Sequence, residues 1–381
     1  MAAQLNYFGE SLRAVGDADY TRLDHNTKSE ESLSFEQQLR SRVIGQDAAV
    51  QALAQLYQVY QAGLNMTGRP IGTLLFMGPT GTGKTKSVEA AAEILFGSPT
   101  SFIRVDCAEF QHSHEIAKLI GSPPGYLGHR ETPPILTQEH INSYHTERVK
   151  LTLVLFDEIE KASDALWQLL LGVLDKATLT LGDNRRVDFS RTIVVMTSNL
   201  GAREMEKLTE TRLGFSMPCI TPADVMNNHL SKLGVEAARR KFSPEFMNRI
   251  DKIVVFKQLS EECLQQILEL ELQTVQRRVL ATGSGRFFLR YTERAKQFLL
   301  AEGTDARYGA RPLKRTIERN IVLPLSNLMA TRQIGEGDVI LIDLAQDEPM
   351  LAFLKQNVAS IFSSRYDSPF GRKPSRQTKI A

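Results

Sequence analysis

The eight residues GPTGTGKT, at positions 78–85, restrict the possible folds of this chain more than any other segment. They fit the pattern G-x-x-x-x-G-K-[S/T], in which glycines let backbone N–H groups turn inward around phosphate oxygens. The apolar run GTLLFMG before them is typical of a buried strand, and TKSVEAAAEILFG after them predicts a helix that ends at Gly97. The N-terminus of that helix adds the positive end of its dipole. The segment therefore predicts a strand, a phosphate-binding loop and a helix, as in a parallel α/β sheet.

The phosphate-binding loop is predicted to bind ATP together with Mg²⁺. Lys84 would reach the β- and γ-phosphates, and the hydroxyl of Thr85 would hold the metal ion. A glycine-rich loop can arise by chance, but the strand before it and the helix after it favour the phosphate site. The predicted nucleotide-binding residues of the loop are Gly78, Pro79, Thr80, Gly81, Thr82, Gly83, Lys84 and Thr85.

The segment LVLFDEIE, at positions 153–160, supplies the acidic groups that such a site needs. Its apolar part predicts a buried strand that delivers Asp157 and Glu158 at its carboxyl end. Asp157 would hold Mg²⁺, directly or through water, and Glu158 would orient and deprotonate the attacking water. An acidic pair after a strand is often only a turn, so this interpretation depends on the phosphate-binding loop.

Further strands and helices extend the α/β pattern along the chain. SFIRVDC and RTIVVMTSN are typical of strands, and the helices between the strands predict a parallel sheet that is covered on both faces. After residue 257 the segments become mainly helical, with RFFLRY and DVILIDL as a small strand pair. We therefore predict an α/β fold with a smaller, mainly helical C-terminal domain. The predicted divisions are an N-terminal extension and linker at 1–39, a large domain at 40–257, a small domain at 258–345, and a C-terminal extension with a basic tail at 346–381.

Charge and composition exclude several classes of partner. The chain has 46 Lys and Arg residues against 44 Asp and Glu, a net charge of +2, which gives no strong attraction to nucleic acid or to an acidic membrane. No apolar run reaches the roughly 18 residues of a membrane span, and the first residues lack a signal-peptide pattern. Cys107, Cys219 and Cys263 lie far apart and predict neither a disulfide framework nor a zinc site. We expect a cytoplasmic protein.

Several segments that chemistry alone does not interpret occur in a recognisable order. VIGQDAAV precedes the phosphate-binding loop, and TSNLGA, FSPEFMNRID and RYGARPLKR follow the acidic strand. Together with the two nucleotide motifs, they closely resemble the Clp-type AAA+ unfoldases. The resemblance is to the second ATPase module of the ClpA/ClpB group with its small domain, and it covers about residues 40–345. It implies the AAA+ version of the predicted fold.

The resemblance implies further site residues. Asn199, in TSN, matches the polar sensor that helps to position the water, and Ile44 matches the stretch that contacts the adenine. Arg249, in NRID, matches the arginine finger that reaches the γ-phosphate of a neighbouring subunit. Arg311, in GAR, matches the sensor arginine of the small domain and is also predicted to contact the nucleotide. A finger arginine can change the rate by about 10³–10⁵, because phosphoryl transfer is accelerated mainly by positioning and charge neutralisation.

The resemblance also implies a ring and a pore. The family assembles as a hexamer, so a homohexamer is expected here. The loop GSPPGYLG, at 121–128, matches the family's pore loop, and Tyr126 with Leu127 would contact a polypeptide client. An aromatic ring offers apolar contact without demanding one sequence, although a buried loop anchor is the alternative role for Tyr126. Asp183 to Arg186, in LTLGDNRRVDF, match a second pore loop.

One further tripeptide raises the possibility of a protease partner. Members that feed the ClpP peptidase carry an apolar-Gly-apolar tripeptide between the sensor asparagine and the finger. Leu213, Gly214 and Phe215 lie in that interval, although a local packing turn would give the same pattern.

The sequence thus supports two functions of different class. The first is an ATP-driven unfoldase or remodelling chaperone, which threads polypeptide clients through a ring pore and feeds a ClpP-like peptidase if the tripeptide docks. The alternative is a non-threading AAA+ switch or loader that acts on a macromolecular assembly. The near-neutral charge and Tyr126 favour the first.

Overall fold

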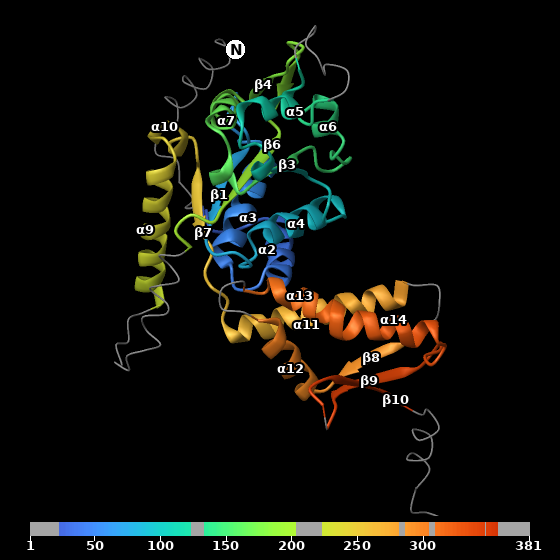
Figure 1. The fold of residues 1–381 in the computed structure, drawn as a ribbon. Coiled ribbons are helices and arrows are strands. Elements are labelled where there is room, and N and C mark those ends of the chain that lie inside the picture. Colours follow the sequence, from blue (N-terminus) through green and yellow to red (C-terminus); the bar gives the residue numbers. More distant parts are fainter. Residues whose placement is uncertain are drawn as a thin grey trace, which may run out of the picture.

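The fold is described in a computed structural model of the chain (Figure 1). The described residues are 23–122, 133–202, 223–281, 286–304, 309–346 and 348–356, with the side chains of 223–231 left out. None of the described helices combines the length and the hydropathy that are needed to cross a membrane.

A five-stranded parallel sheet forms the centre of the larger part. Its strands, in spatial order, are β2 (Ile103–Asp106), β3 (Thr152–Asp157), β6 (Thr192–Ser198), β1 (Gly72–Met77) and β7 (Lys252–Val255). Every residue of β1, β3 and β6 is buried, because helices cover both faces of the sheet. The prediction of a parallel sheet covered on both faces is confirmed.

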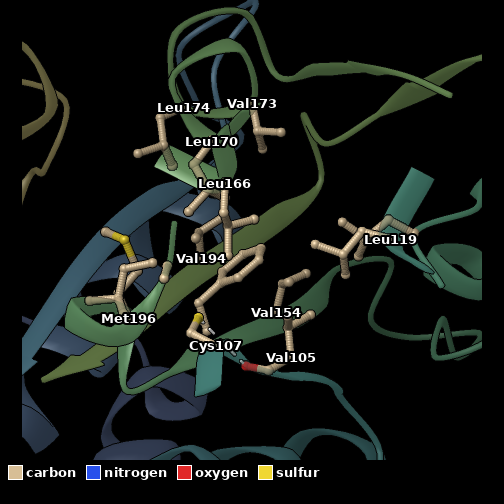
Figure 2. Close-up of a cluster of buried hydrophobic side chains, with 14 of the residues drawn as sticks. Val105, Cys107, Leu119, Val154, Leu166, Leu170, Val173, Leu174, Val194 and Met196 are labelled. Atoms are coloured by element: carbon tan, nitrogen blue, oxygen red, sulfur yellow. Dashed lines mark hydrogen bonds between the residues drawn. The ribbon is translucent and has the colours of Figure 1, made fainter. Parts of the chain in front are cut away.

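Two sets of helices cover the sheet. One face packs against α2 (Glu30–Arg42), α3 (Asp47–Gln61) and α4 (Lys84–Phe96), and the other against α7 (Asp164–Lys176), α9 (Ala223–Lys241) and α10 (Pro244–Met247). Alternate strand residues enter the two cores, so that Val154 and Val194 meet Leu166 and Leu170 of α7 on the second face (Figure 2). The shorter elements are η1 (Cys107–Glu109), η2 (Ser113–Ile116), α5 (Ala117–Ile120), α6 (Gln138–Asn142), η3 (Ile159–Lys161), β4 (Thr178–Thr180) and β5 (Arg186–Asp188).

The first described helix begins earlier than its apolar pattern indicates. The sequence predicted an extension and linker up to residue 39, but α2 begins at Glu30, inside that linker. Ser29 explains the difference, because its hydroxyl accepts a hydrogen bond from the N–H of Ser32 at 3.2 Å and caps the helix. Glu30 and Glu31 then lie in the first turn, where the helix dipole favours negative charge.

The C-terminal part has its own core and its own sheet (Figure 1). Its elements are α11 (Glu261–Ala281), β8 (Phe288–Tyr291), α12 (Glu293–Gly303), α13 (Arg311–Ile317), the π-helix η4 (Glu318–Val322), α14 (Leu323–Ala330), β9 (Val339–Leu344) and β10 (Leu351–Lys355). β8 pairs with β9, as the two strand-like segments predicted, and the structure shows that the pairing is parallel. β10 adds an antiparallel third strand beyond residue 345, where we expected the small domain to end. The domain limits themselves stay a prediction.

The hairpin of β4 and β5 packs closely against the chain that leads into residues 123–132. The N–H of Gly182 donates to the carbonyl of Ile120 at 2.8 Å. A Cβ atom at Gly182 would lie 2.4 Å from the carbonyl oxygen of Gly121, and its next neighbours would also be backbone atoms. Only glycine therefore fits at this contact without movement of the backbone.

We expect Gly182→Ala to lower the free energy of unfolding by about 1–3 kcal/mol, the usual cost of overpacking. Gly172, on the exposed side of α7, is the matched control, because its added Cβ would meet only one backbone oxygen at 3.8 Å. Gly172→Ala should raise stability by up to about 1 kcal/mol through helix propensity. Urea unfolding followed by circular dichroism measures both. Wild-type stability in Gly182→Ala would show that the hairpin is not held against Gly121.

Candidate nucleotide-binding site

The carboxyl ends of three adjacent parallel strands bring the predicted site residues together. β1 leads into the phosphate-binding loop, β3 ends at Asp157 with Glu158 next, and β6 ends just before Asn199. Parallel strands that lie side by side present these ends at the same edge of the sheet, the usual position of a ligand site in α/β proteins.

The phosphate-binding loop has the backbone that an anion site requires. Gly78, Gly81 and Gly83 have positive φ angles, and Gly83 caps α4 with φ 100°. No side chain of the described residues caps the first turn of α4, so its N–H groups face toward the loop without a side-chain acceptor. A Cβ atom at Gly78 would lie 2.5 Å from the carbonyl oxygen of Phe256, so the loop lies directly on the chain after β7. The loop therefore fits a phosphate group.

Lys84 is a buried cation that is held by its own loop. Its ammonium donates to the carbonyls of Gly78 at 2.7 Å and Pro79 at 2.8 Å, and to Oδ1 of Asn199 at 2.9 Å. The residue is only 8% exposed, and burial lowers the pKa of its ammonium from 10.5 to about 8. The carboxylates of Glu160, Asp157 and Glu158 oppose that shift, and the charge of Arg311 adds to it. A buried cation with neutral acceptors favours an anionic ligand.

Asp157 accepts from groups on three other elements. Its Oδ1 accepts from the hydroxyl of Thr197 on β6 and lies 3.5 Å from the hydroxyl of Thr85 on α4. Its Oδ2 accepts from Nη2 of Arg104 on β2 at 2.6 Å. Thr85 and Asp157 thus offer a hydroxyl and a carboxylate side by side, which suits Mg²⁺, a cation that takes few protein oxygens and completes its shell with water and phosphate. The described residues hold no cluster of three or more His, Cys, Asp or Glu side chains that would suit another kind of metal site.

Glu158 lies in a strained turn between β3 and η3. Its φ of 56° is in the left-handed region, which is unfavourable for a residue with a side chain and recurs at functional sites. Its N–H donates to the hydroxyl of Thr197 at 3.0 Å, and Oε1 accepts from Nδ2 of Asn199 at 3.3 Å. Oε2 forms an ion pair with Lys161 at 2.5 Å. The backbone and the side chain of Glu158 are therefore both fixed by neighbouring polar groups.

Asn199 links the two groups that are predicted to act on the phosphate and the water. Its Oδ1 accepts from Lys84, and its Nδ2 donates to Glu158. Its own N–H donates to Oε1 of Glu160 at 3.0 Å. The other oxygen of Glu160 is buried and has no hydrogen-bond partner among the described residues. The side-chain amide of Asn199 thus lies between the ammonium of Lys84 and the carboxylate of Glu158.

Sequence reasoning missed four residues of this site. Glu160 orients Asn199, Thr197 contacts both acidic residues, and Arg104 contacts Asp157. Gln46 was also missed: its Nε2 donates to the carbonyls of Thr82 at 3.1 Å and Lys257 at 2.9 Å. For Arg104 a signal existed, because IRVD alternates apolar and charged residues in a strand that pairs with LVLFD. For Gln46 only the VIGQ resemblance pointed to this region.

Two of the remaining predicted residues, Ile44 and Arg311, lie beside residues that contact the loop. Ile44 is half-buried between α2 and α3, two positions before Gln46. Arg311 begins α13, and the N–H of the preceding Ala310 donates to the carbonyl of Gly81 at 3.4 Å. Gly309 approaches so closely that an added Cβ would lie 2.8 Å from the same oxygen. The C-terminal part therefore touches the phosphate-binding loop through the turn before Arg311.

Arg249 lies at the opposite side of the sheet, where the amino ends of the parallel strands lie. It precedes the amino end of β7, and the N–H of Asp251 donates to the carbonyl of Thr73 at the start of β1. A six-residue strand such as β1 spans about 20 Å, which separates Arg249 from the phosphate-binding loop of the same chain. Its guanidinium instead pairs with Asp175 at 3.3 Å.

Of the three other predicted segments, the structure describes one. Tyr126 and Leu127, and the tripeptide Leu213–Gly214–Phe215, fall outside the described residues. Asp183 to Arg185 lie in the turn of the hairpin and Arg186 begins β5; Arg185 pairs with Asp183 at 2.7 Å.

Comparison with known proteins agrees with the geometry. Two family models match the chain: an AAA domain (Cdc48 subfamily) at residues 69–253, and the C-terminal, D2-small domain of ClpB protein at residues 259–342. The chain is 38% identical over 317 residues to the chaperone protein ClpC2, chloroplastic, of Arabidopsis thaliana, which covers 83% of this chain and 32% of the relative. It is 36% identical over 330 residues to the chaperone protein ClpB 1 of Thermosynechococcus vestitus, and that match covers 87% of this chain and 35% of the relative. The chain thus spans about a third of the length of these relatives.

A solved structure of a related protein shares the fold. It is described as a closed-state electron cryomicroscopy reconstruction of Hsp104 with ATPγS and FITC casein, and it matches with a TM-score of 0.70 and 29% identity. The match covers 87% of this chain and 53% of the Hsp104 chain. The two family models match adjacent segments in the order in which the sequence motifs occur, and the sheet and the C-terminal part agree with them, so this chain belongs to the Clp-type AAA+ ATPase family.

Proposed function

We propose that this chain hydrolyses ATP and uses the energy to unfold or remodel polypeptides. The observation that carries the proposal is the bond pattern of Asn199, which joins Lys84 to Glu158 at the edge of the sheet where the phosphate-binding loop begins. Lys84 would exchange its loop carbonyls for the β- and γ-phosphates. Mg²⁺, held near Thr85 and Asp157, would neutralise charge that develops on the phosphates.

The positions of Glu158 and Asn199 support a hydrolytic role. Glu158 would accept the proton of the attacking water, since its carboxylate is half-exposed while its backbone is fixed by Thr197. Asn199 would orient that water from a position between Glu158 and Lys84. Arg311, whose charge already acts on Lys84, would contact the nucleotide from the small domain, and Ile44 would contact the adenine.

The affinity for ATP should fall as the pH rises above about 8. The pKa of Lys84 in the free site is about 8, and bound phosphate would raise it, so ATP binding takes up a proton. Raising the pH from 7 to 9 should weaken binding about tenfold, one decade for each pH unit above the pKa of the free site. Titration of a fluorescent ATP analogue measures the effect.

Lys84→Arg is the control for this prediction, because a guanidinium stays charged throughout that range. Its affinity should be weaker overall, but nearly independent of pH from 7 to 9. An equal loss of affinity in both proteins would assign the pH effect to another group.

We further propose that Arg249 acts on the site of a neighbouring subunit, in a homohexameric ring. At the far edge of its own sheet, Arg249 is about one strand length from its own phosphate-binding loop. It also lines a hollow of about 230 Å³ together with Leu64 and Met66, two residues that are 78% and 71% exposed. Exposed apolar residues around a charged group are consistent with a surface that another subunit covers.

Mixed rings should test the shared site. Glu158→Gln should bind ATP but barely turn over, and Arg249→Ala should bind ATP and lose about 10³-fold or more in turnover. Mixing the two inactive proteins should restore some hydrolysis, because an intact Glu158 then faces an intact Arg249 across an interface. ATPase assays of mixtures whose composition is verified measure the rescue. No rescue in verified mixed rings would contradict a finger in trans, and normal turnover in Glu158→Gln would contradict the hydrolytic site.

We propose polypeptides as the clients, gripped in the ring pore by Tyr126 and Leu127, with Asp183 to Arg186 as a second contact. The hairpin that carries Asp183 packs against Gly121, at the start of the Tyr126 loop, so the two predicted contacts would neighbour each other. The related Hsp104 structure was determined with casein. Docking of a ClpP-like peptidase on Leu213–Gly214–Phe215 stays a prediction. The cytoplasmic location also stays a prediction, since relatives of this chain include chloroplastic proteins.

Loss of the Tyr126 ring should separate ATP use from unfolding. Tyr126→Ala should keep ATPase activity within a few-fold and lose most unfolding of a tagged fluorescent client, while Tyr126→Phe should keep much of both, since the proposed contact is apolar. Paired assays of turnover and client fluorescence measure this, with thermal melting as the control. Unchanged unfolding in a stable Tyr126→Ala protein would favour the non-threading switch. A large loss of thermal stability would favour the loop-anchor role of Tyr126.

A further inference from the structure

Arg104 lies on the edge strand β2, beside the carboxylate that is proposed to hold Mg²⁺. The burial of β2 alternates, with Ile103 and Val105 inside and Arg104 and Asp106 outside. In the parallel register, Arg104 pairs with Leu155 and Asp106 pairs with Asp157. The side chain of Arg104 therefore starts two positions before Asp157 on the same side of the sheet and extends along it, toward the carboxyl edge.

The guanidinium of Arg104 engages one oxygen of Asp157 directly. Nη2 lies 2.6 Å from Oδ2, a short charge-assisted hydrogen bond. The other oxygen, Oδ1, already accepts from Thr197 and lies near Thr85. A metal ion next to Thr85 and Asp157 would thus meet a carboxylate that is already neutralised by a cation.

A structural role alone explains this contact poorly. β2 is joined to β3 by backbone pairing along all four of its residues, and Ile103 and Val105 are buried in the core. The side chain of Arg104 is 51% exposed, so solvent screens the ion pair and it adds little to stability. The same exposure lets the guanidinium swing into solvent when a metal ion takes its place at the buried Asp157, so that the carboxylate keeps a positive partner.

Asp106 strengthens the electrostatic argument. It lies next to Asp157 in the register of the sheet, and its Oδ1 accepts from the N–H of Ala108 at 3.0 Å. Two adjacent carboxylates would attract a divalent cation strongly if no protein cation were close. Arg104, from the same strand as Asp106, supplies the cation that contacts Asp157 directly.

We propose that Arg104 sets the affinity of the site for its divalent cation, by competing with the metal ion for Asp157. The inference rests on the nucleotide site proposed above. Arg104 is a positioning residue: it acts on the metal through Asp157, weakens its binding, and makes the metal ion easier to release after each turnover.

Metal binding can be measured without turnover. Mn²⁺ replaces Mg²⁺ as the probe, and the electron paramagnetic resonance signal of free Mn²⁺ is followed during titration of the full chain with a non-hydrolysable ATP analogue. Arg104→Gln should lower the Kd for Mn²⁺ about three- to tenfold, because removal of one nearby positive charge strengthens the attraction between Mn²⁺ and the carboxylate. Arg104→Met, which keeps the apolar stem, should give the same shift, and it replaces Arg104→Gln if that variant does not fold.

Lys161→Gln is the matched control. It also removes a positive charge from this edge of the sheet, but Lys161 pairs with Glu158 and not with Asp157. Its Kd for Mn²⁺ should stay within about twofold of wild type, since the effect depends on direct contact with Asp157. An unchanged or higher Kd in both Arg104 variants would overturn the inference, and so would an equal decrease in Lys161→Gln.

The same titration separates this inference from the proposed function. Failure of the wild-type chain to bind the ATP analogue with Mn²⁺ would overturn the proposed nucleotide site and the inference together. Normal binding by the wild type, without a shift in the Arg104 variants, would overturn the role of Arg104 alone.

Discussion

β1 pairs with β6 on one side and with β7 on the other. These pairings position the phosphate-binding loop at the carboxyl end of β1 and the segment that carries Arg249 at its amino end. At the carboxyl end of β1, Gly78 rests against the carbonyl of Phe256, so the chain after β7 supports the phosphate-binding loop. At the amino end, Asp251 binds both the N–H and the carbonyl of Thr73, which fixes the segment that carries Arg249. One buried strand therefore holds the loop and the predicted finger at a fixed separation. A register shift in this strand would displace both.

Much of this arrangement could be predicted from the sequence, because its strongest signals are local. The loop at 78–85 and the acidic pair at 157–158 both follow continuous apolar runs, and a parallel sheet brings such ends to one edge. The helix start at Glu30 was missed because a single cap residue, Ser29, decides it, and β10 was missed because its apolar run, LAFLK, is only five residues long. Propensity and periodicity carry little information about either.

The contacts around the acidic pair depend on sheet register, which a single sequence does not reveal. Thr197 contacts Asp157 and Glu158 because β6 lies beside β3, and Arg104 reaches Asp157 because β2 lies on its other side. Neither strand order nor register follows from the spacing of these residues along the chain. The contact of Glu160 also depends on strand order, since its hydrogen bond from the N–H of Asn199 joins the end of β6 to the turn after β3. The residue types identify candidate site residues, but the strand order and register of the sheet determine which of them are in contact.

The site keeps its buried charges hydrogen-bonded before any ligand arrives. Lys84 donates to two loop carbonyls and to Asn199, while Asp157 accepts from Thr197 and Arg104. An unpaired buried charge is costly, so a protein that binds and releases a charged ligand needs alternative partners for the empty state. Binding of phosphate and metal then replaces the protein partners of Lys84 and Asp157 with ligand partners. The net free energy of binding is the difference between the free energies of these two sets of interactions. A ligand held by such an exchange can be released in every cycle, which suits a site that must turn over repeatedly.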